Sequence, residues 1–401
     1  MVNIIIDGKR ISIEEGSTIL QAAEKVGIDI PTLCHLDLHD IKMVNKCATC
    51  RICVVEVEGR RNLAPACATP VYENMVVKTN TLRVLNARRT ILELMLSDHP
   101  QDCLICKKSG NCKLQDLAQR FGLRQVHYYD GEKSTYIKDI STSIVRDMDK
   151  CIMCRRCETM CNNVQTVGAL SAINRGFNAV VSPAFEEKLE NTVCTYCGQC
   201  VAVCPVGALT EKENIWAVVD ALVNKDKVVI VQTAPAVRVA LGEEFGLEAG
   251  QVVTGKMVAA LRRLGFDYVF DTDFAADLTI MEEGAELLDR IERYINKDET
   301  VKLPMLTSCC PGWVNFLESQ FHDLLDTPSS AKSPQQMFGS IVKSYFAQKL
   351  LIPREKMVVV SVMPCLAKKF EASKEEFKVN GNPDVDICIS TRELAHLKIH
   401  I

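Results

Sequence analysis

Twenty cysteines in a chain of 401 residues constrain this fold more than any other feature. Two copies of one spacing, C-x2-C-x2-C-x3-C, begin at Cys151 and at Cys194. In this spacing three thiolates wrap one cubane cluster and the fourth reaches the other cluster, so two [4Fe–4S] clusters on a duplicated half-domain are predicted. The predicted ligands of the first cluster are Cys151, Cys154, Cys157 and Cys204. Those of the second are Cys194, Cys197, Cys200 and Cys161.

Structural zinc is the alternative use of cysteines at such short spacings. A zinc site takes four ligands of its own and does not need two interlocking runs, so the spacing favours clusters. Pro205 follows the second run, as the bacterial ferredoxin pattern expects, whereas Asn162 stands in that place after the first.

The start of the chain, MVNIIIDGKR, lacks the order of basic, apolar and small residues that makes a secretory signal. No apolar run approaches the ~20 residues that span a bilayer. We therefore expect a cytoplasmic protein whose reduced thiols bind metal instead of forming disulfides. A net charge of −4 gives no strongly basic face, so nucleic acid is not expected as a partner.

A second kind of cluster site is predicted near the N-terminus, where single cysteines flank a C-x2-C on a β-rich frame. This arrangement fits a [2Fe–2S] cluster, and its predicted ligands are Cys34, Cys50, Cys53 and Cys67. Cys47 also forms a C-x2-C with Cys50, which leaves the register open. We prefer Cys50 and Cys53 because they abut the strand predicted at Val54–Glu58, with Cys47 as a spare thiol.

A third site combines one histidine with three cysteines. Its predicted ligands to a further [4Fe–4S] cluster are His99, Cys103, Cys106 and Cys112. The histidine stands at a predicted helix end, before Pro100, beside three cysteines that otherwise lack a fourth ligand. A neutral imidazole in place of a thiolate should raise the cluster's reduction potential. Together the sites predict a relay of one [2Fe–2S] and three [4Fe–4S] clusters, with fourteen irons.

Local patterns predict the elements of the first half. Residues 3–13 alternate around Asp7-Gly8, a hairpin signal, and Ser17 is predicted to cap a helix that runs to Val26 and ends at Gly27. The further predicted elements are a strand at 75–78, helices at 81–97 and 115–121, and a linker at 128–138.

After Thr210 apolar runs alternate with helical stretches, which argues for an α/β domain. The predicted strands are Val228–Val231, Tyr268–Phe270, Met357–Val362 and Val385–Ile389. The predicted helices are Lys256–Leu264, Glu283–Tyr294 and Pro334–Leu350.

Two segments of this half, Thr307–Trp313 (TSCCPGW) and Met363–Glu371 (MPCLAKKFE), resemble the first two signature loops of the [FeFe]-hydrogenase catalytic subunit. Both follow predicted strands, at the edge where α/β folds place sites. Neighbours in a regular strand face opposite ways, so the adjacent cysteines Cys309 and Cys310 require a loop. The N-terminal iron–sulfur sites are similar to those of complex I and of multi-subunit NAD(P)-linked hydrogenases.

The resemblance implies roles for residues around the H-cluster, a cubane joined to a two-iron unit. Cys310 and Cys365 would be cubane ligands, Cys309 the proton-exchanging thiol, and Lys368 a donor to a cyanide of the two-iron unit. The cofactor's apolar wall and polar lining would consist of Ala234, Pro235, Met363, Ser333 and Gln335.

The resemblance also implies a proton path to Cys309, through Glu283, Glu286, Arg290 and Ser329. The two glutamates lie at i and i+3, hence on one helical face. From their spacing alone, the two glutamates would be interpreted as solvated charges on a helix surface. The resemblance to the family instead favours a role in proton transfer.

The family has a third loop with two cysteines three residues apart, which completes the cubane. After Cys365 this sequence has Cys388, predicted to be a buried packing residue, and ends at His400-Ile401. We therefore expect residues 1–401 by themselves not to assemble an active H-cluster unless the C-terminal part is supplied.

The expected architecture is α+β and α/β multidomain. The predicted domains are a β-grasp plant-type ferredoxin domain (1–80), a small cluster domain with one His and three Cys ligands (81–135), a two-cluster bacterial ferredoxin domain (136–213), and the first part of the iron-hydrogenase catalytic domain (214–401).

The expected function is reversible H2 oxidation and proton reduction, in an anaerobic metabolism. The expected partners are ferredoxin or a flavin-bearing NAD(P)-reactive diaphorase, and hydrogenase maturation proteins. No G-x-G-x-x-G fingerprint occurs, so NAD should bind elsewhere. The alternatives are an electron-transfer subunit of the complex I or formate dehydrogenase type, which does not explain the signature loops, and a hydrogenase-like sensor or assembly protein.

Overall fold

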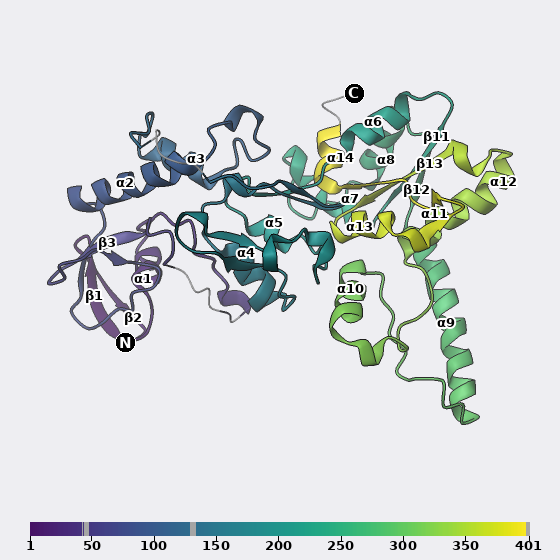
Figure 1. Ribbon diagram of the computed structural model, residues 1–401, viewed down its shortest axis with the longest axis horizontal. Helices are drawn as coiled ribbons and strands as arrows, with labels where there is room; N and C mark the ends of the chain where they lie inside the picture. The colour runs from purple at the N-terminus through teal and green to yellow at the C-terminus, as the bar shows by residue number, and fades with distance from the viewer. Residues whose placement is uncertain (42, 44–47, 129–133, 398–401) are drawn as a thin grey trace. The chain divides into compact units, whose positions relative to one another are not determined.

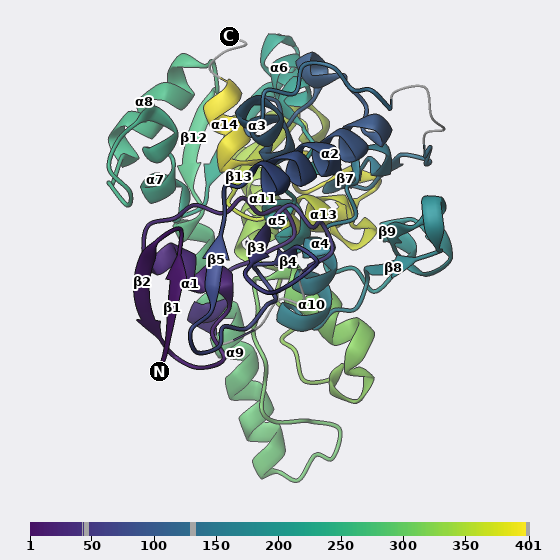
Figure 2. The same ribbon diagram turned by 90° about the vertical axis from the view of Figure 1, so that its left-hand side faces the viewer.

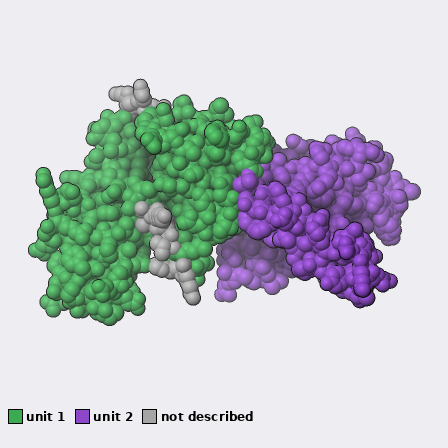
Figure 3. All heavy atoms as spheres, turned by 60° about the horizontal axis from the view of Figure 1, so that its bottom comes forward, with its two compact units in different colours: residues 1–139, 145–192, 199–210 green, residues 140–144, 193–198, 211–401 purple. Residues whose placement is uncertain are grey.

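The chain forms two compact units, which Figure 3 colours separately. The computed structural model describes residues 1–41, 43, 48–128 and 134–397. The first unit comprises residues 1–139, 145–192 and 199–210, and the second comprises residues 140–144, 193–198 and 211–401. Three features named in the sequence analysis lie outside the described residues. These are Cys47, residues 129–133 of the linker predicted at 128–138, and His400-Ile401. No helix in the described part of the chain is long and apolar enough to cross a membrane.

A five-stranded sheet, in the order β2-β1-β5-β3-β4, opens the first unit (Figure 2). Its strands are β1 (Val2–Ile6), β2 (Lys9–Ile13), β3 (Val54–Val57), β4 (Ala64–Pro65) and β5 (Val76–Lys78). The hairpin predicted at Asp7-Gly8 is confirmed, because β1 and β2 pair antiparallel with Ile6 opposite Lys9. Both turn residues have positive φ, 47° and 83°, as a two-residue hairpin requires.

Helix α1 (Ile19–Lys25) packs its apolar residues into the core of this sheet. The predicted cap, Ser17, is wrong by one residue. Thr18 is the N-cap, and it forms a capping box with Gln21, whose side chain accepts a hydrogen bond from the Thr18 backbone N–H at 2.8 Å. Gly27 follows the C-cap with φ 70°, as predicted.

The rest of the first unit is built from short elements. The helices predicted at 81–97 and 115–121 are α2 (Leu82–Asp98) and α3 (Lys113–Arg120). The other helices and strands up to residue 211 are β6 (Asp139–Ile140), β7 (Ile144–Arg146), α4 (Arg156–Thr159), β8 (Ser171–Ile173), β9 (Val180–Ser182), α5 (Gln199–Val203) and β10 (Leu209–Glu211).

A parallel sheet, in the order β12-β11-β13-β16, is the centre of the second unit (Figure 1). Its strands are β11 (Val228–Thr233), β12 (Tyr268–Asp271), β13 (Met357–Met363) and β16 (Ile387–Ser390), so all four predicted strands are confirmed. Val229 and Val231 face one apolar core and Ile230 the other, because successive side chains alternate across a strand. Helices therefore cover both faces.

The helices of the second unit are α6 (Ile215–Val223), α7 (Val237–Ala240), α8 (Thr254–Arg263), α9 (Asp273–Ile295), α10 (Pro311–Gln320), α11 (Pro334–Ile341), α12 (Ala347–Leu350), α13 (Ala367–Ser373) and α14 (Thr391–Leu397). Residues of α6, α8 and α14 pack on one face of the sheet, and residues of α9, α11 and α12 on the other. A short antiparallel pair, β14 (Lys378–Val379) and β15 (Asn382–Pro383), lies between α13 and β16 in the sequence.

Two helix predictions in this unit need correction. Helix α9 begins at Asp273, well before the predicted Glu283, because the whole stretch after β12 continues as helix. The predicted helix Pro334–Leu350 is interrupted by a π-helical turn at Val342–Phe346, where the buried Lys343 donates to Asp386 at 2.8 Å.

The corrected cap makes a prediction about local stability. Thr18→Ala should lower the free energy of opening of α1 by about 1 kcal/mol, because the hydroxyl acceptor of the capping box is lost. Hydrogen exchange at the α1 amides measures this change. Ser17→Ala is the matched control and should change it by less than about 0.5 kcal/mol. Equal effects of the two substitutions would contradict the assignment of Thr18.

Candidate functional site

The carboxyl ends of the central parallel strands bring several predicted site residues to one edge of the sheet. Strand β11 is followed by Ala234, which is buried, and by Pro235, which is exposed. Strand β13 ends at the buried Met363 and is followed by Pro364 and Cys365. The prediction that the second signature loop follows a strand is therefore confirmed.

A buried ion pair fixes the second signature loop. Lys368 Nζ lies 2.9 Å from Glu371 Oε2, and Gln335 Nε2 donates to the same oxygen at 2.9 Å. Gln335 Nε2 also lies 3.1 Å from the Lys368 carbonyl. Glu371 is a site residue that the sequence prediction missed, although its i, i+3 spacing from Lys368 is a pairing signal. Cys365 is half-buried, and burial raises the pKa of its thiol, to which the nearby Cys310 adds.

The first signature loop has irregular backbone up to the N-cap of α10, so the predicted loop at the adjacent cysteines is confirmed. Cys309 and Cys310 are both exposed, and the Cys310 N–H donates to Ser308 Oγ at 3.1 Å. The prediction of a strand before this loop is wrong, since Leu306 makes an isolated bridge with Pro328 outside the sheet.

The loop of residues 193–198 packs against the beginning of α10. It carries Cys194 and Cys197, two of the predicted cluster ligands. A Cβ on Gly312 would lie 3.2 Å from the Thr195 carbonyl oxygen and 3.7 Å from Cys310 Sγ. The close approach of these two backbones therefore requires a small residue at position 312.

The same loop packs against the second signature loop. The Tyr196 ring stacks on the Phe370 ring with a centroid distance of 4.4 Å. A Cβ on Gly198 would lie 2.8 Å from Leu366 Cδ1, and Gly198 has φ 77°. A glycine is thus required one residue after Cys197, where the chain touches the residue that follows Cys365. The loop 193–198 contacts both signature loops.

Charged residues of α9 form a hydrogen-bonded group with the segment after α10. Glu286 Oε2 accepts from Ser329 Oγ at 2.6 Å, and Glu286 Oε1 pairs with Arg290 at 2.6 Å. Arg290 also donates to the Pro328 carbonyl at 2.7 Å. Burial acts to raise the pKa of Glu286, but the hydrogen bonds from Ser329, Arg290 and the Ser330 backbone outweigh it and lower that pKa. Burial, and then the charge of Glu286, raise the pKa of Glu283.

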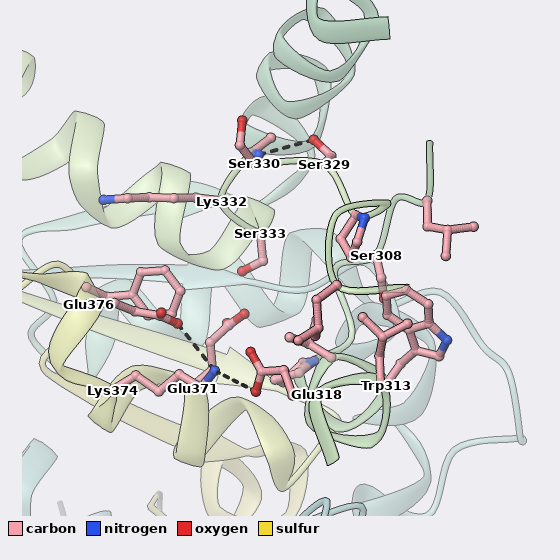
Figure 4. Close-up of a pocket in the computed structure, with 18 of the residues that line it drawn as sticks. Ser308, Trp313, Glu318, Ser329, Ser330, Lys332, Ser333, Glu371, Lys374 and Glu376 are labelled. Atoms are coloured by element: carbon pink, nitrogen blue, oxygen red, sulfur yellow. Dashed lines mark hydrogen bonds and ion pairs between the residues drawn. The ribbon is translucent and has the colours of Figure 1, made fainter. Parts of the chain in front are cut away.

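These elements enclose a cavity of about 290 Å³ (Figure 4). Its lining includes Glu283, Ser329 and Ser333 from the predicted set, and Glu371 from α13. Ser308 and Trp313 line it from the first signature loop and α10. No hydrogen bond among the described residues joins Cys309 to Glu283 or Glu286, so the structure brings together the glutamates and Ser329 but not this thiol.

In the first unit, the four cysteines predicted to hold the [2Fe–2S] cluster lie together and are buried. Cys53 Sγ lies 3.3 Å from Cys67 Sγ, and side-chain hydrogen bonds link Cys34 to Cys50 and to Cys67. The hydrogen bond between Cys34 and Cys50 lowers the pKa of Cys34 and raises that of Cys50. A buried group of four thiols fits a cluster that needs four thiolates.

His99 follows the last residue of α2, and Cys112 is the N-cap of α3. The Nδ1 atom of His99 is buried without a hydrogen-bond partner, and burial lowers the pKa of this histidine. An orphaned buried nitrogen fits a metal ligand. Cys106 lies so close to Gly207 that a Cβ there would be 2.7 Å from its Sγ. Cys103 is exposed.

The four cysteines predicted for the first ferredoxin-type cluster line one small apolar cavity, to which Met148 and Val181 also contribute. Cys204, from the second run, thus joins the three cysteines of the first run, as the interlocking pattern predicts. Burial raises the pKa of Cys151 to about 11 and that of Cys154 to about 12.

The ligands predicted for the second ferredoxin-type cluster divide between the units. Cys161 and Cys200 belong to the first unit, and Cys194 and Cys197 to the second. No disulfide joins any of the described cysteines. Nor do three His, Cys, Asp or Glu side chains of the described ranges converge on a point that could hold a single metal ion. In a [4Fe–4S] cluster each thiolate binds a different iron, and in a [2Fe–2S] cluster each iron takes two thiolates, so that finding concerns sites for one ion.

Family models match the chain in four stretches. Residues 227–398 match the C-terminal domain of the iron-only hydrogenase large subunit. Residues 1–82 match a 2Fe-2S iron-sulfur cluster binding domain. Residues 88–127 match the NADH-ubiquinone oxidoreductase-G iron-sulfur binding region, and residues 141–210 the ferredoxin-like domain of NADH-quinone oxidoreductase subunit 3.

Curated relatives match over different extents. The chain is 72% identical over 397 residues to the NADP-reducing hydrogenase subunit HndD of Solidesulfovibrio fructosivorans, which covers 99% of this chain and 68% of that protein. It is 38% identical to iron hydrogenase 1 of Clostridium pasteurianum, over 99% of this chain and 67% of that protein. Similarity to the mitochondrial NADH-ubiquinone oxidoreductase 78 kDa subunit of Neurospora crassa, 37% identical, covers 53% of this chain and 28% of that protein. The complex I likeness therefore stops near the middle of the chain, whereas the hydrogenase likeness runs through it, and the chain belongs to the iron-only, or [FeFe]-, hydrogenase family.

Proposed function

We propose that this chain is the catalytic subunit of a multi-subunit, NADP-linked hydrogenase that exchanges two electrons and two protons with H2. The packing of the loop 193–198 against both signature loops is the observation that carries this proposal. That loop bears Cys194 and Cys197, and it touches the neighbours of Cys310 and Cys365. Electrons from the relay would thus arrive next to the reacting centre.

The relay would hold one [2Fe–2S] and three [4Fe–4S] clusters on the ligands predicted from the sequence, on a β-grasp N-terminal domain and domains bounded near residues 80, 135 and 213. Three observations support the ligand sets in the first unit: the four buried thiols around Cys53, the orphaned Nδ1 of His99, and the shared cavity of Cys151 and Cys204. The electron partner would be a flavin-bearing NADP-reactive subunit or ferredoxin, since the relative that is 72% identical to the chain is an NADP-reducing hydrogenase subunit. Maturation proteins would insert the H-cluster.

When bound, the H-cluster supplies the exchange of electrons with H2. Cys310 and Cys365 would be two of the ligands of its cubane, and Ala234, Pro235 and Met363 would form the apolar wall around its two-iron unit. Gln335 and Glu371 hold Lys368 in place in the first turn of α13, so its ammonium group would donate to the two-iron unit with little loss of entropy on binding.

Protons would pass along α9 between solvent and Cys309. Glu286 is fixed by Ser329 and Arg290, and Glu283 lines the cavity one helical turn before it. The opposite pKa shifts of these two carboxyls suit a relay, because Glu283 holds a proton more readily than Glu286 does. Ser333 would contribute to the polar lining of the same cavity.

The thiol of Cys309 gives the test of this function. In the matured enzyme with its C-terminal part supplied, Cys309→Ser should lower H2-dependent reduction of a viologen dye by about 100-fold or more, because a hydroxyl is a far weaker acid than a thiol. Iron content should stay unchanged. Ser319→Ala, on α10 and outside the lining of the cavity, is the control and should keep activity within about twofold. Full activity of Cys309→Ser would remove this residue from the proton path.

A second prediction concerns the glutamate that Ser329 and Arg290 hold. Glu286→Gln should lower the same activity by about 100-fold, since the amide cannot release and rebind a proton. Asp277, an exposed carboxylate nine residues before Glu286 and therefore on the opposite side of α9, provides the control Asp277→Asn, which should stay within about twofold of wild type. Equal activity of both variants would leave the α9 carboxylates as ordinary surface charges.

A third prediction tests the interlocking of the two cysteine runs. Cys204→Ser and Cys154→Ser should abolish the same [4Fe–4S] signal in electron paramagnetic resonance, because both residues line one cavity. Each should lower the iron content by about four of the fourteen irons expected for the relay. Loss of two different signals would place Cys204 in another cluster.

A further inference from the structure

One buried cation of the first unit has no role in the relay described so far. Arg88, on α2, is 2% exposed. Its Nη2 donates to the carbonyl of Val54 at 2.8 Å, and Val54 is the residue after the predicted ligand Cys53. Burying a guanidinium is costly unless an opposite charge compensates it.

Another buried arginine shows how such compensation normally works. Arg146 is 4% exposed, and its Nη1 lies 3.0 Å from the carboxylate of Asp139. Arg88 forms no such ion pair with a carboxylate among the residues described. The Nε of each arginine is buried without a hydrogen-bond partner, so the two differ in the carboxylate that Arg146 has and Arg88 lacks. The missing opposite charge points to a negatively charged group that the polypeptide by itself does not supply.

The charge that acts most favourably on Arg88 is the thiolate of Cys53, ahead of the more remote carboxylates of Asp29 and Asp7. Burial lowers the pKa of Arg88 to about 10, so the guanidinium keeps its proton at neutral pH. Cys53 in turn lies 3.3 Å from Cys67, in the group of four buried thiols. A cluster of four thiolates and two sulfides carries net negative charge, and this charge grows by one when the cluster is reduced.

We propose that Arg88 is the fixed positive charge that sets the reduction potential of the [2Fe–2S] cluster, by stabilising its reduced form. This inference rests on the cluster assignment made under the proposed function. In the step concerned, one electron from a neighbouring relay cluster enters the [2Fe–2S] cluster and no proton moves, because Arg88 stays protonated in both states. Arg88 is thus a tuning and positioning residue, not an iron ligand.

The size of the effect follows from electrostatics. A unit charge on the order of 10 Å away, at an effective dielectric constant of about 20, changes a one-electron equilibrium by roughly tenfold or more. Tenfold corresponds to 59 mV for one electron. A lysine at position 88 keeps the charge and can still reach toward the Val54 carbonyl, whereas a methionine keeps the length of the side chain and removes the charge.

The test is a potentiometric titration of the whole protein, monitored by the electron paramagnetic resonance of the [2Fe–2S] cluster. Arg88→Met should shift the reduction equilibrium at least about tenfold toward the oxidised form, and Arg88→Lys less than about threefold. The [4Fe–4S] clusters of the same sample are the internal reference and should keep their potentials. Arg83→Met is the matched control on the same helix, since Arg83 is half-exposed and paired with Glu56 at 3.7 Å, and it should cause no shift.

An unchanged potential in Arg88→Met, or equal shifts in Arg88→Met and Arg88→Lys, would overturn the inference. If Arg88→Met fails to hold the cluster, protein labelled with arginine that carries 15N in the guanidinium group only decides the question. Pulsed resonance should then detect 15N coupling to the reduced [2Fe–2S] cluster in wild type and lose that coupling in Arg88→Lys. Retention of the coupling in Arg88→Lys, or its absence from wild type, would contradict the role of Arg88. Absence of any [2Fe–2S] signal from wild type would instead contradict the cluster assignment.

Discussion

The loop of residues 193–198 packs on both signature loops, and the proposed delivery of electrons to the reacting centre depends on that contact. Electron transfer needs close approach, and close approach of these three loops needs residues without side chains at the points of contact. Gly198 and Gly312 meet this need, because a Cβ at either position would press on Leu366 or on the Thr195 carbonyl. The stacked rings of Tyr196 and Phe370 hold the same surfaces together.

Buried cations are neutralised differently in the two units. In the second unit each described cation near the signature loops has a carboxylate: Lys368 has Glu371, and Arg290 has Glu286. These pairs are positioned by further hydrogen bonds from Gln335 and Ser329, as buried charges require. In the first unit Arg88 has no carboxylate partner among the described residues, and we propose that the negative charge of the [2Fe–2S] cluster compensates its charge.

The sequence predicted most of the sheet and helix elements and the grouping of Cys204 with Cys151, because ligand spacing and strand patterning are local signals. It missed Glu371 and Arg88 as functional candidates, since their partners, Gln335 and Val54, lie 36 and 34 residues away in the sequence. Ser17 and Thr18 are both good caps, and only the turn geometry decides between them. The prediction of a strand before Cys309 was wrong. The pattern of apolar residues cannot distinguish a segment that makes one isolated bridge from a strand that pairs in a sheet.

Exposure of the matured enzyme to H2, with no other reductant, tests the central claim most directly. If this chain couples H2 to the relay, electron paramagnetic resonance of samples frozen under H2 should show reduced [4Fe–4S] and [2Fe–2S] signals, and these should be absent from samples frozen under argon. Signals that appear with dithionite but never with H2 would contradict a catalytic subunit and leave an electron carrier.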